Sequence, residues 1–258
     1  LKDASATAIY GSRASNGVVL ITTKRGHDGK AKIQYEGYIG WQQLPKTLDM
    51  MNLKDYASFY NERANILGWG VRSDYKDPSL LTNGTDWQNV LFRTAFMDNH
   101  QVNVSGGAKD IAYSFSGGYL DQDGVGIGSS FNRASFRANF DIDVNKYIKL
   151  GMNGYFANTK QVTTFDQSNA IQTALNQFPD VAPVNPDGTY GFPQVNDFAT
   201  YYSNPLFEAQ MRENNSKNSS LDYNFFANIT PIKGLTLRVE YGGSYGWGNT
   251  YYFQPSYS

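Results

Sequence analysis

Residues 132–143 read NRASFRANFDID, and apolar and polar side chains alternate along this stretch. The apolar positions are Ala134, Phe136, Ala138, Phe140 and Ile142. Successive side chains of a β-strand point to opposite faces of a sheet, so a period of two predicts a strand with one apolar and one polar face. The stretch therefore indicates an all-β fold.

The same alternation recurs on both sides of this stretch. It is found at 32–43, 101–105, 111–120, 147–158, 219–230 and 235–247. Together these stretches predict about seven strands, most of them near the roughly 9–11 residues that cross a bilayer at a tilt. Helical spacing of apolar residues occurs at 52–67 and 168–178, inside two of the connections.

The composition agrees with a β-rich membrane protein. Aromatic residues make up 15% of the 258 residues and charged residues only 17%. No apolar run approaches the roughly 20 residues of a membrane helix, whereas a barrel strand shows lipid only every second side chain. A formal net charge of −1 gives no reason to expect a nucleic-acid partner.

Metal, cofactor and catalytic chemistry have little support in the sequence. The chain has no cysteine, and its two histidines, His27 and His100, lie far apart. Thiolate sites are therefore excluded, and a histidine-based zinc or catalytic centre is not expected. We expect no cofactor.

The connections between the predicted strands alternate in length. Those after the second, fourth and sixth strands are short, whereas those near 44–98, 121–130 and 161–216 are longer. Outer-membrane barrels have short periplasmic turns and longer extracellular loops. An open sheet in hydrocarbon would leave edge N–H and C=O groups unpaired, and barrels begin at about eight strands. Seven strands therefore predict part of a larger transmembrane antiparallel β-barrel.

Residues 1–26, LKDASATAIYGSRASNGVVLITTKRG, carry a second signal. They resemble the end of the plug domain of TonB-dependent outer-membrane transporters, and most closely the SusC/RagA branch found in Bacteroidetes. Looser resemblance continues through LPKTLDMMNLKDYASFYNE and FNRASFRANFDIDVNKYIKLGMN. The resemblance implies that residues 1–27 end an internal plug and that 28–258 form the N-terminal part of a plugged barrel of about 22 strands. Since the chain opens without an initiator Met, we expect it to be a piece of a longer protein.

By this resemblance the whole protein imports a nutrient, an oligosaccharide or a peptide, across the bacterial outer membrane. A SusD-like surface lipoprotein is the implied partner. TonB is implied as the source of energy, acting through a segment absent from this chain, and outer-membrane lipid surrounds the barrel. Such a transporter makes and breaks no bond, so the resemblance implies that the protein is not an enzyme.

Two sets of candidate site residues follow. Charged groups on the polar strand faces are expected to contact basic plug residues. The alternative is that these groups form an ordinary solvated barrel wall. The candidates are Arg13, Lys24 and Arg25 in the plug and Glu36, Asp141 and Glu240 on the strands. Loop aromatics are candidates for stacking on a substrate, and the alternative is that they form the cores of the loops; the set is Trp87, Tyr190, Tyr201 and Tyr202. A third group is expected to mark the membrane interface: Tyr38, Trp41, Tyr241, Tyr245 and Trp247.

Two rival functions remain open at this point. One is a passive porin or surface receptor built on the same barrel. The other is a secreted all-β glycan-binding module or glycosidase domain. The faces that carry Phe136, Phe140, Leu237 and Val239 separate these possibilities, because they point into lipid in a transporter and into a packed interior in a soluble module.

Overall fold

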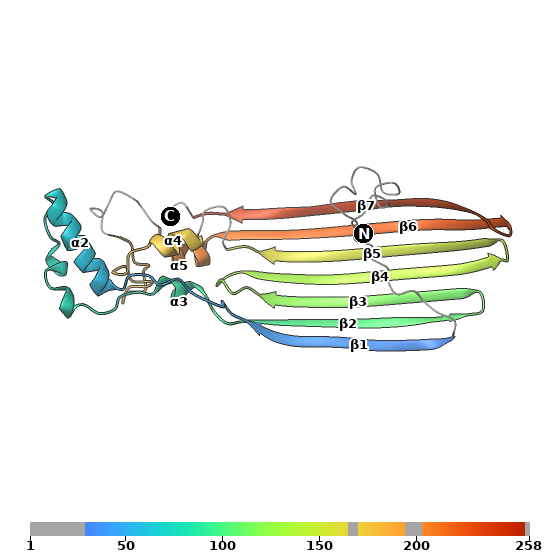
Figure 1. Cartoon of the computed structure of the whole chain (residues 1–258), viewed down its shortest axis with the longest axis horizontal. Helices are drawn as coiled ribbons and strands as arrows, with labels where there is room; N and C mark the ends of the chain where they lie inside the picture. The colour runs from blue at the N-terminus through green and yellow to red at the C-terminus, as the bar shows by residue number, and fades with distance from the viewer. Residues whose placement is uncertain (1–28, 165–169, 194–202, 256–258) are drawn as a thin grey trace.

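The chain forms one seven-stranded antiparallel sheet in which each strand pairs with its neighbours in sequence (Figure 1). The computed structural model describes residues 29–164, 170–193 and 203–255. The strands are β1 (Gly29–Gln42), β2 (Ala95–Ala108), β3 (Ile111–Asp123), β4 (Ser130–Asn145), β5 (Ile148–Val162), β6 (Glu213–Ile232) and β7 (Leu235–Phe253). The prediction of about seven antiparallel strands is confirmed.

The register places most apolar side chains of the seven strands on one face. One cross-strand row runs through Tyr35, Val102, Gly117, Phe136, Phe156, Leu221 and Tyr245. Phe136, Leu237 and Val239 on this face are 51%, 56% and 54% exposed. No second layer covers them among the described residues, so the packed interior expected of a soluble glycan-binding module is not found.

The apolar face has the height of a bilayer core. Its rows run from the level of Leu237 to that of Trp247 on β7. A rise of about 3.4 Å per residue and a tilt of about 40° give this band a height of about 26 Å, close to the roughly 25 Å of outer-membrane barrels.

Beyond the band the same face becomes polar. On the long-loop side, the first row of this face beyond Trp247 consists of Ile39, Asp98, Asp121, Asn132, Lys160, Lys217 and Asn249. Apart from Ile39, charged and amide side chains replace apolar ones in this row. The strands therefore extend past the apolar band at this end. This is why β6 and β7 reach 20 and 19 residues.

The opposite face is largely polar, although Leu120 and Phe226 also lie on it. A representative row is Gln34, Asn103, Ser116, Arg137, Tyr155, Asp222 and Ser244. Tyr38 lies on this polar face, because it is one residue out of phase with Ile39 and Trp41. Its assignment to an interfacial belt was wrong, whereas Trp41, Tyr241, Tyr245 and Trp247 do lie on the apolar face.

The connections are sorted by length between the two ends of the sheet. Turns at 109–110, 146–147 and 233–234 close one end, and connections at 43–94, 124–129 and 163–212 leave the other. All labelled helices lie beyond the second end (Figure 1). The predicted alternation of loop lengths is confirmed. No helix among the described residues is both long and apolar enough to cross a membrane.

The longest helix lies in the first long connection, where the sequence predicts it. Helix α2 (Leu53–Leu67) begins after Asn52, whose Oδ1 accepts a hydrogen bond from the Asp55 amide at 3.0 Å. It ends at Gly68, where φ of 70° is readily adopted by glycine. Its buried residues, Leu53, Ala57, Tyr60 and Ala64, share one face.

Short elements join the three long connections into one layer. They are η2 (Ser73–Tyr75), η3 (Pro78–Leu80), α3 (Trp87–Leu91), α4 (Ala170–Asn176) and α5 (Pro205–Met211). Trp87, Leu91, Ala174, Val181 and Leu206 form a shared apolar cluster. The second connection joins it through Ile127, whose amide donates to the Leu91 carbonyl at 3.0 Å.

Candidate functional site

A buried cluster lies on the polar face of the sheet near the short turns. Asp141, Gly151, Phe226 and Glu240 occupy one cross-strand row. The Phe226 ring lies over Gly151, since a Cβ at Gly151 would be 2.1 Å from Phe226 Cζ. Asp141 and Phe226 are each only 4% exposed, although the rest of this face is largely open.

Charge surrounds this ring. The Arg238 guanidinium lies 4.3 Å from the centroid of Phe226 and forms an ion pair with Glu240. Arg238 also donates to Asn228 Oδ1 at 3.2 Å. The row therefore combines two carboxylates and one aromatic ring, and Arg238 adds a guanidinium from the neighbouring row. This arrangement is suited to holding a charged polypeptide segment.

The structure separates the predicted wall carboxylates into two places. Asp141 and Glu240 share the row just described, whereas Glu36 is exposed on β1 in a row with Gln101 and Gly118. The basic candidates Arg13, Lys24 and Arg25 lie outside the described residues.

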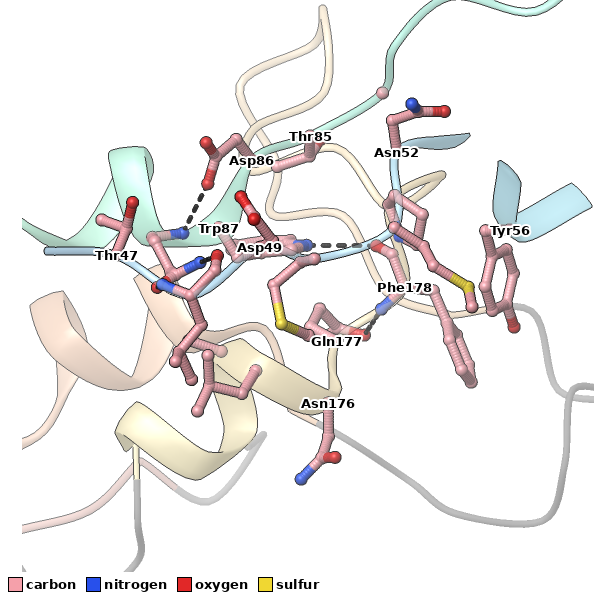
Figure 2. A pocket seen from close by; sticks show the side chains of 18 of the residues that line it. Thr47, Asp49, Asn52, Tyr56, Thr85, Asp86, Trp87, Asn176, Gln177 and Phe178 are labelled. Carbon is pink, nitrogen blue, oxygen red and sulfur yellow. Dashed lines mark hydrogen bonds between the residues drawn. The ribbon is translucent and has the colours of Figure 1, made fainter. Parts of the chain in front are cut away.

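A second candidate site is a cavity of about 740 Å³ among the long connections (Figure 2). That volume is within the about 300–1,000 Å³ of ligand pockets. It is enclosed by 47–52, by the start of α3 and by the end of α4 with the residues after it. In Figure 2 the segment from Thr47 to Asn52 crosses the cavity, with Thr85 and Asp86 on one side and Asn176 and Gln177 on the other.

Hydrogen bonds fix the walls of this cavity. Trp87 Nε1 donates to the Phe178 carbonyl at 3.1 Å, and the Thr85 amide donates to the Pro179 carbonyl at 2.8 Å. Gln177 Oε1 accepts from the Phe178 amide at 3.0 Å. The bonds from Trp87 and Thr85 connect the first and third long connections, which are far apart in sequence.

A cluster next to the cavity strengthens the same connection. Tyr75 is 1% exposed, and its hydroxyl donates to Asp180 Oδ2 at 2.7 Å. Arg72 lies 3.1 Å from the same oxygen. Burial raises the pKa of Tyr75 far above its ordinary value, and the Asp180 hydrogen bond adds to the effect. The Arg72 hydrogen bond lowers the pKa of Asp74.

The two candidate substrate aromatics that the structure describes are engaged in packing. Trp87 lines the cavity but is 4% exposed. Tyr190 donates to Gln210 Oε1 at 2.7 Å and packs edge-on against Phe207, and it does not line the cavity. Tyr201 and Tyr202 lie outside the described residues.

Several cavity residues were not identified from the sequence. Met50 and Met51 are 51% and 55% exposed, and Gln88 is buried with both ends of its amide bonded to Leu48. The run Leu48-Asp49-Met50-Met51 was a usable signal, because three of its four residues are apolar although it lies outside every predicted strand and helix. Within the described ranges no group of three or more metal-binding side chains gathers.

Comparison with known proteins explains this architecture. No family model matches the chain. It is 31% identical over 252 residues to the TonB-dependent receptor P3 of Formosa agariphila, and 35% identical over 224 residues to the TonB-dependent receptor SusC of Bacteroides thetaiotaomicron. The RagAB peptide importer in its open-open state matches 97% of the chain with a TM-score of 0.78 and 28% identity.

The chain is related to the TonB-dependent receptors of the SusC/RagA type. This agrees with the resemblance seen in residues 1–26 and with the two-faced sheet. The relatives are named as receptors and transporters, not as enzymes. The seven strands have the fold of a transmembrane antiparallel barrel wall, and they match the RagAB importer chain in structure.

The chain spans only part of its SusC/RagA-type relatives. It covers 24% of the length of P3, 21% of SusC and 31% of the matched RagAB chain.

Proposed function

We propose that the whole protein imports a nutrient, an oligosaccharide or a peptide, across the bacterial outer membrane with energy supplied through TonB. The proposal rests on how the two faces and the two ends of the sheet differ. One face has an apolar band of bilayer height, the other is polar, and the helices and long connections gather at one end. Similarity to TonB-dependent receptors and to a peptide importer supports the same assignment.

In this proposal residues 1–27 end a plug and 28–258 form the first part of the barrel, which lies in the outer membrane. The polar face then lines the lumen. The buried state of Asp141 and Phe226 supports plug contact at their row, and Glu240 stands in the same row. The basic side chains Arg13, Lys24 and Arg25 complement the charge of these carboxylates and of Glu36.

The long connections are the substrate-facing and partner-facing side. They fold into one layer with its own apolar clusters, so they present a defined surface at the mouth of the barrel. A SusD-like surface lipoprotein is the partner we propose for this layer. Trp87 contributes a wall of its cavity, and Tyr190, Tyr201 and Tyr202 remain proposed substrate contacts. No step makes or breaks a bond, so we propose no enzyme activity.

Uptake by whole cells tests the proposal. Cells lacking the gene and complemented with the full-length protein would receive a fluorescent tryptic digest of casein or fluorescent maltoheptaose. We expect accumulation of one of these probes, and we expect it to be lost when TonB is deleted or when the lipoprotein gene is deleted. Accumulation that persists without TonB would contradict the proposal and indicate a passive pore.

A further inference from the structure

The segment 46–52 is an extended chain with one unpaired edge. It runs without a turn or bend between Pro45 and the start of α2, and its side chains are exposed. On one edge, the Leu48 amide donates to Gln88 Oε1 at 2.9 Å and Gln88 Nε2 donates to the Leu48 carbonyl at 2.7 Å. The buried Gln88 amide thus occupies the place of a neighbouring strand.

The opposite edge has no partner within the described part of the chain. In an extended chain the N–H and C=O groups of adjacent residues point to opposite edges. Those of Thr47, Asp49 and Met51 therefore point away from Gln88. None of them makes a hydrogen bond with another described residue. Three successive pairs of donors and acceptors are available along one line.

This edge borders the 740 Å³ cavity, whose lining has a distinct chemical character. It contains the carboxylates of Asp49 and Asp86 and no Lys, Arg or His among the described lining residues. Asp86 already accepts from the amides of Gln88 and Asn89, whereas Asp49 has no partner in the described structure. The lining therefore favours a neutral or cationic occupant over an anionic one.

The aromatic rings of the cavity do not offer stacking faces for sugars. Trp87 is buried, and Tyr56 packs against Phe178 with ring centroids 5.5 Å apart. Exposed apolar surface comes instead from the flexible side chains of Met50 and Met51. Methionines of this kind adapt to varied apolar side chains.

We propose that residues 47–51 bind an extended peptide, neutral or cationic, as an added β-strand whose side chains enter the cavity. Backbone hydrogen bonds would supply sequence-independent affinity, and the methionines would accept different side chains. The inference rests on the proposed function and assigns peptide as the substrate class of its extracellular layer.

Three variants of the full-length protein test the edge. Asp49→Pro removes the N–H that faces the peptide, Asp49→Asn removes only the charge, and Met50→Pro places the ring on the opposite edge. The probe is the fluorescent peptide Lys-Leu-Thr-Val-Thr-Leu-Lys, with binding measured by anisotropy in detergent. We expect Asp49→Pro to weaken binding about tenfold, as loss of a hydrogen bond requires, and Met50→Pro to leave it nearly unchanged.

A second arm uses the wild-type protein and does not depend on folding of a variant. Two analogues of the probe carry N-methyl groups on alternate backbone nitrogens, in one phase or the other. One analogue should lose binding and the other should retain it, because only one edge of the peptide forms hydrogen bonds with residues 47–51. Equal binding of both analogues, or displacement of the probe by maltoheptaose, would overturn the inference.

The remaining outcomes separate the inference from the proposed function. If Asp49→Pro leaves peptide binding intact but prevents copurification of the surface lipoprotein, the edge is a partner contact and the inference is wrong. If TonB-dependent uptake of casein peptides persists unchanged in Asp49→Pro, the inference fails and the proposed import stands. Loss of TonB dependence in the wild type would instead overturn the proposed function.

Discussion

Gln88 holds Leu48 by two hydrogen bonds, one to each backbone group of that residue. The pairing joins the extended chain before α2 to the first turn of α3, across forty positions of sequence. Gln88 is 6% exposed, so its amide is removed from water and depends on these two partners. This contact sets the position of the cavity wall.

Replacing Gln88 with Leu is expected to loosen this wall without unfolding the layer. The loss of two hydrogen bonds to partly exposed groups costs roughly 1–2 kcal/mol, which corresponds to about tenfold faster exchange of the Leu48 amide. Hydrogen exchange of the full-length protein measures the effect. Asn83→Ala is the control, because the Asn83 side chain is exposed and makes no hydrogen bond with a described residue.

The buried phenol of Tyr75 is expected to make the protein less stable at alkaline pH. Its pKa is raised above the ordinary value of 10.0 by burial, so the folded state keeps the phenol proton when the unfolded state releases it. The contribution of this raised pKa to the free energy of unfolding is fully present below pH 10.0 and is lost as the pH rises above that value. Tyr75→Phe should flatten this decline while lowering stability at neutral pH by about 1 kcal/mol through loss of the Asp180 bond.

Thermal unfolding midpoints at several pH values compare the two proteins. A decline at alkaline pH that is equally steep in wild type and Tyr75→Phe would show that another group is responsible.

Gly151 is predicted to tolerate no side chain. An added Cβ would lie 2.1 Å from Phe226 Cζ and 2.8 Å from Asp141 Oδ1. Since Phe226 is buried, Gly151→Ala must displace its ring and is expected to cost about 1–3 kcal/mol. Gly154→Ala on the same strand is the control, because its nearest contact is the Ala138 carbonyl at 4.0 Å. Denaturant unfolding of the barrel in detergent measures both, and equal midpoints would refute the packing described.

The apolar band predicts a position-dependent cost for charge. Phe140 lies in the middle rows of the band, so Phe140→Arg is expected to destabilise the folded barrel by roughly 2–4 kcal/mol. Asn132 is on the same strand and face but beyond the band, where Arg should cost roughly 0–1 kcal/mol. Unfolding from lipid vesicles measures the two costs. Similar costs for the two substitutions would show that the apolar band is assigned to the wrong rows.

The sequence predicted the strands best where one face meets the apolar band. The stretch 132–143 lies within β4, and 235–247 lies within β7. The predicted 219–230 missed the first residues of β6, because residues 213–218 (ENNSKN) are polar on both faces and leave no alternation. Likewise, Asp98 and His100 interrupt the apolar face of β2, so only 101–105 was identified.

Helices followed a similar rule. Helix α2 was predicted because apolar and aromatic residues repeat at helical spacing over 52–67, and four of them are buried in the structure. Helices α3 and α5 are too short for such a repeat, although Asp86 and Asn204 each cap the helix that follows and Pro205 begins α5. The cavity was not predictable, since it depends on contacts between connections such as Trp87 with Phe178.

Lipid exposure along β4 tests the central claim most directly. The chain contains no cysteine, so single cysteines at positions 132–143 can carry a spin label in the full-length protein in lipid vesicles, in a background free of other cysteines. Oxygen accessibility is the measurement. We predict high values at even positions from 134 to 142 and low values at the odd positions between them. Uniform values, or high values at the odd positions, would contradict the assignment of this sheet as a barrel wall with its polar face toward the lumen.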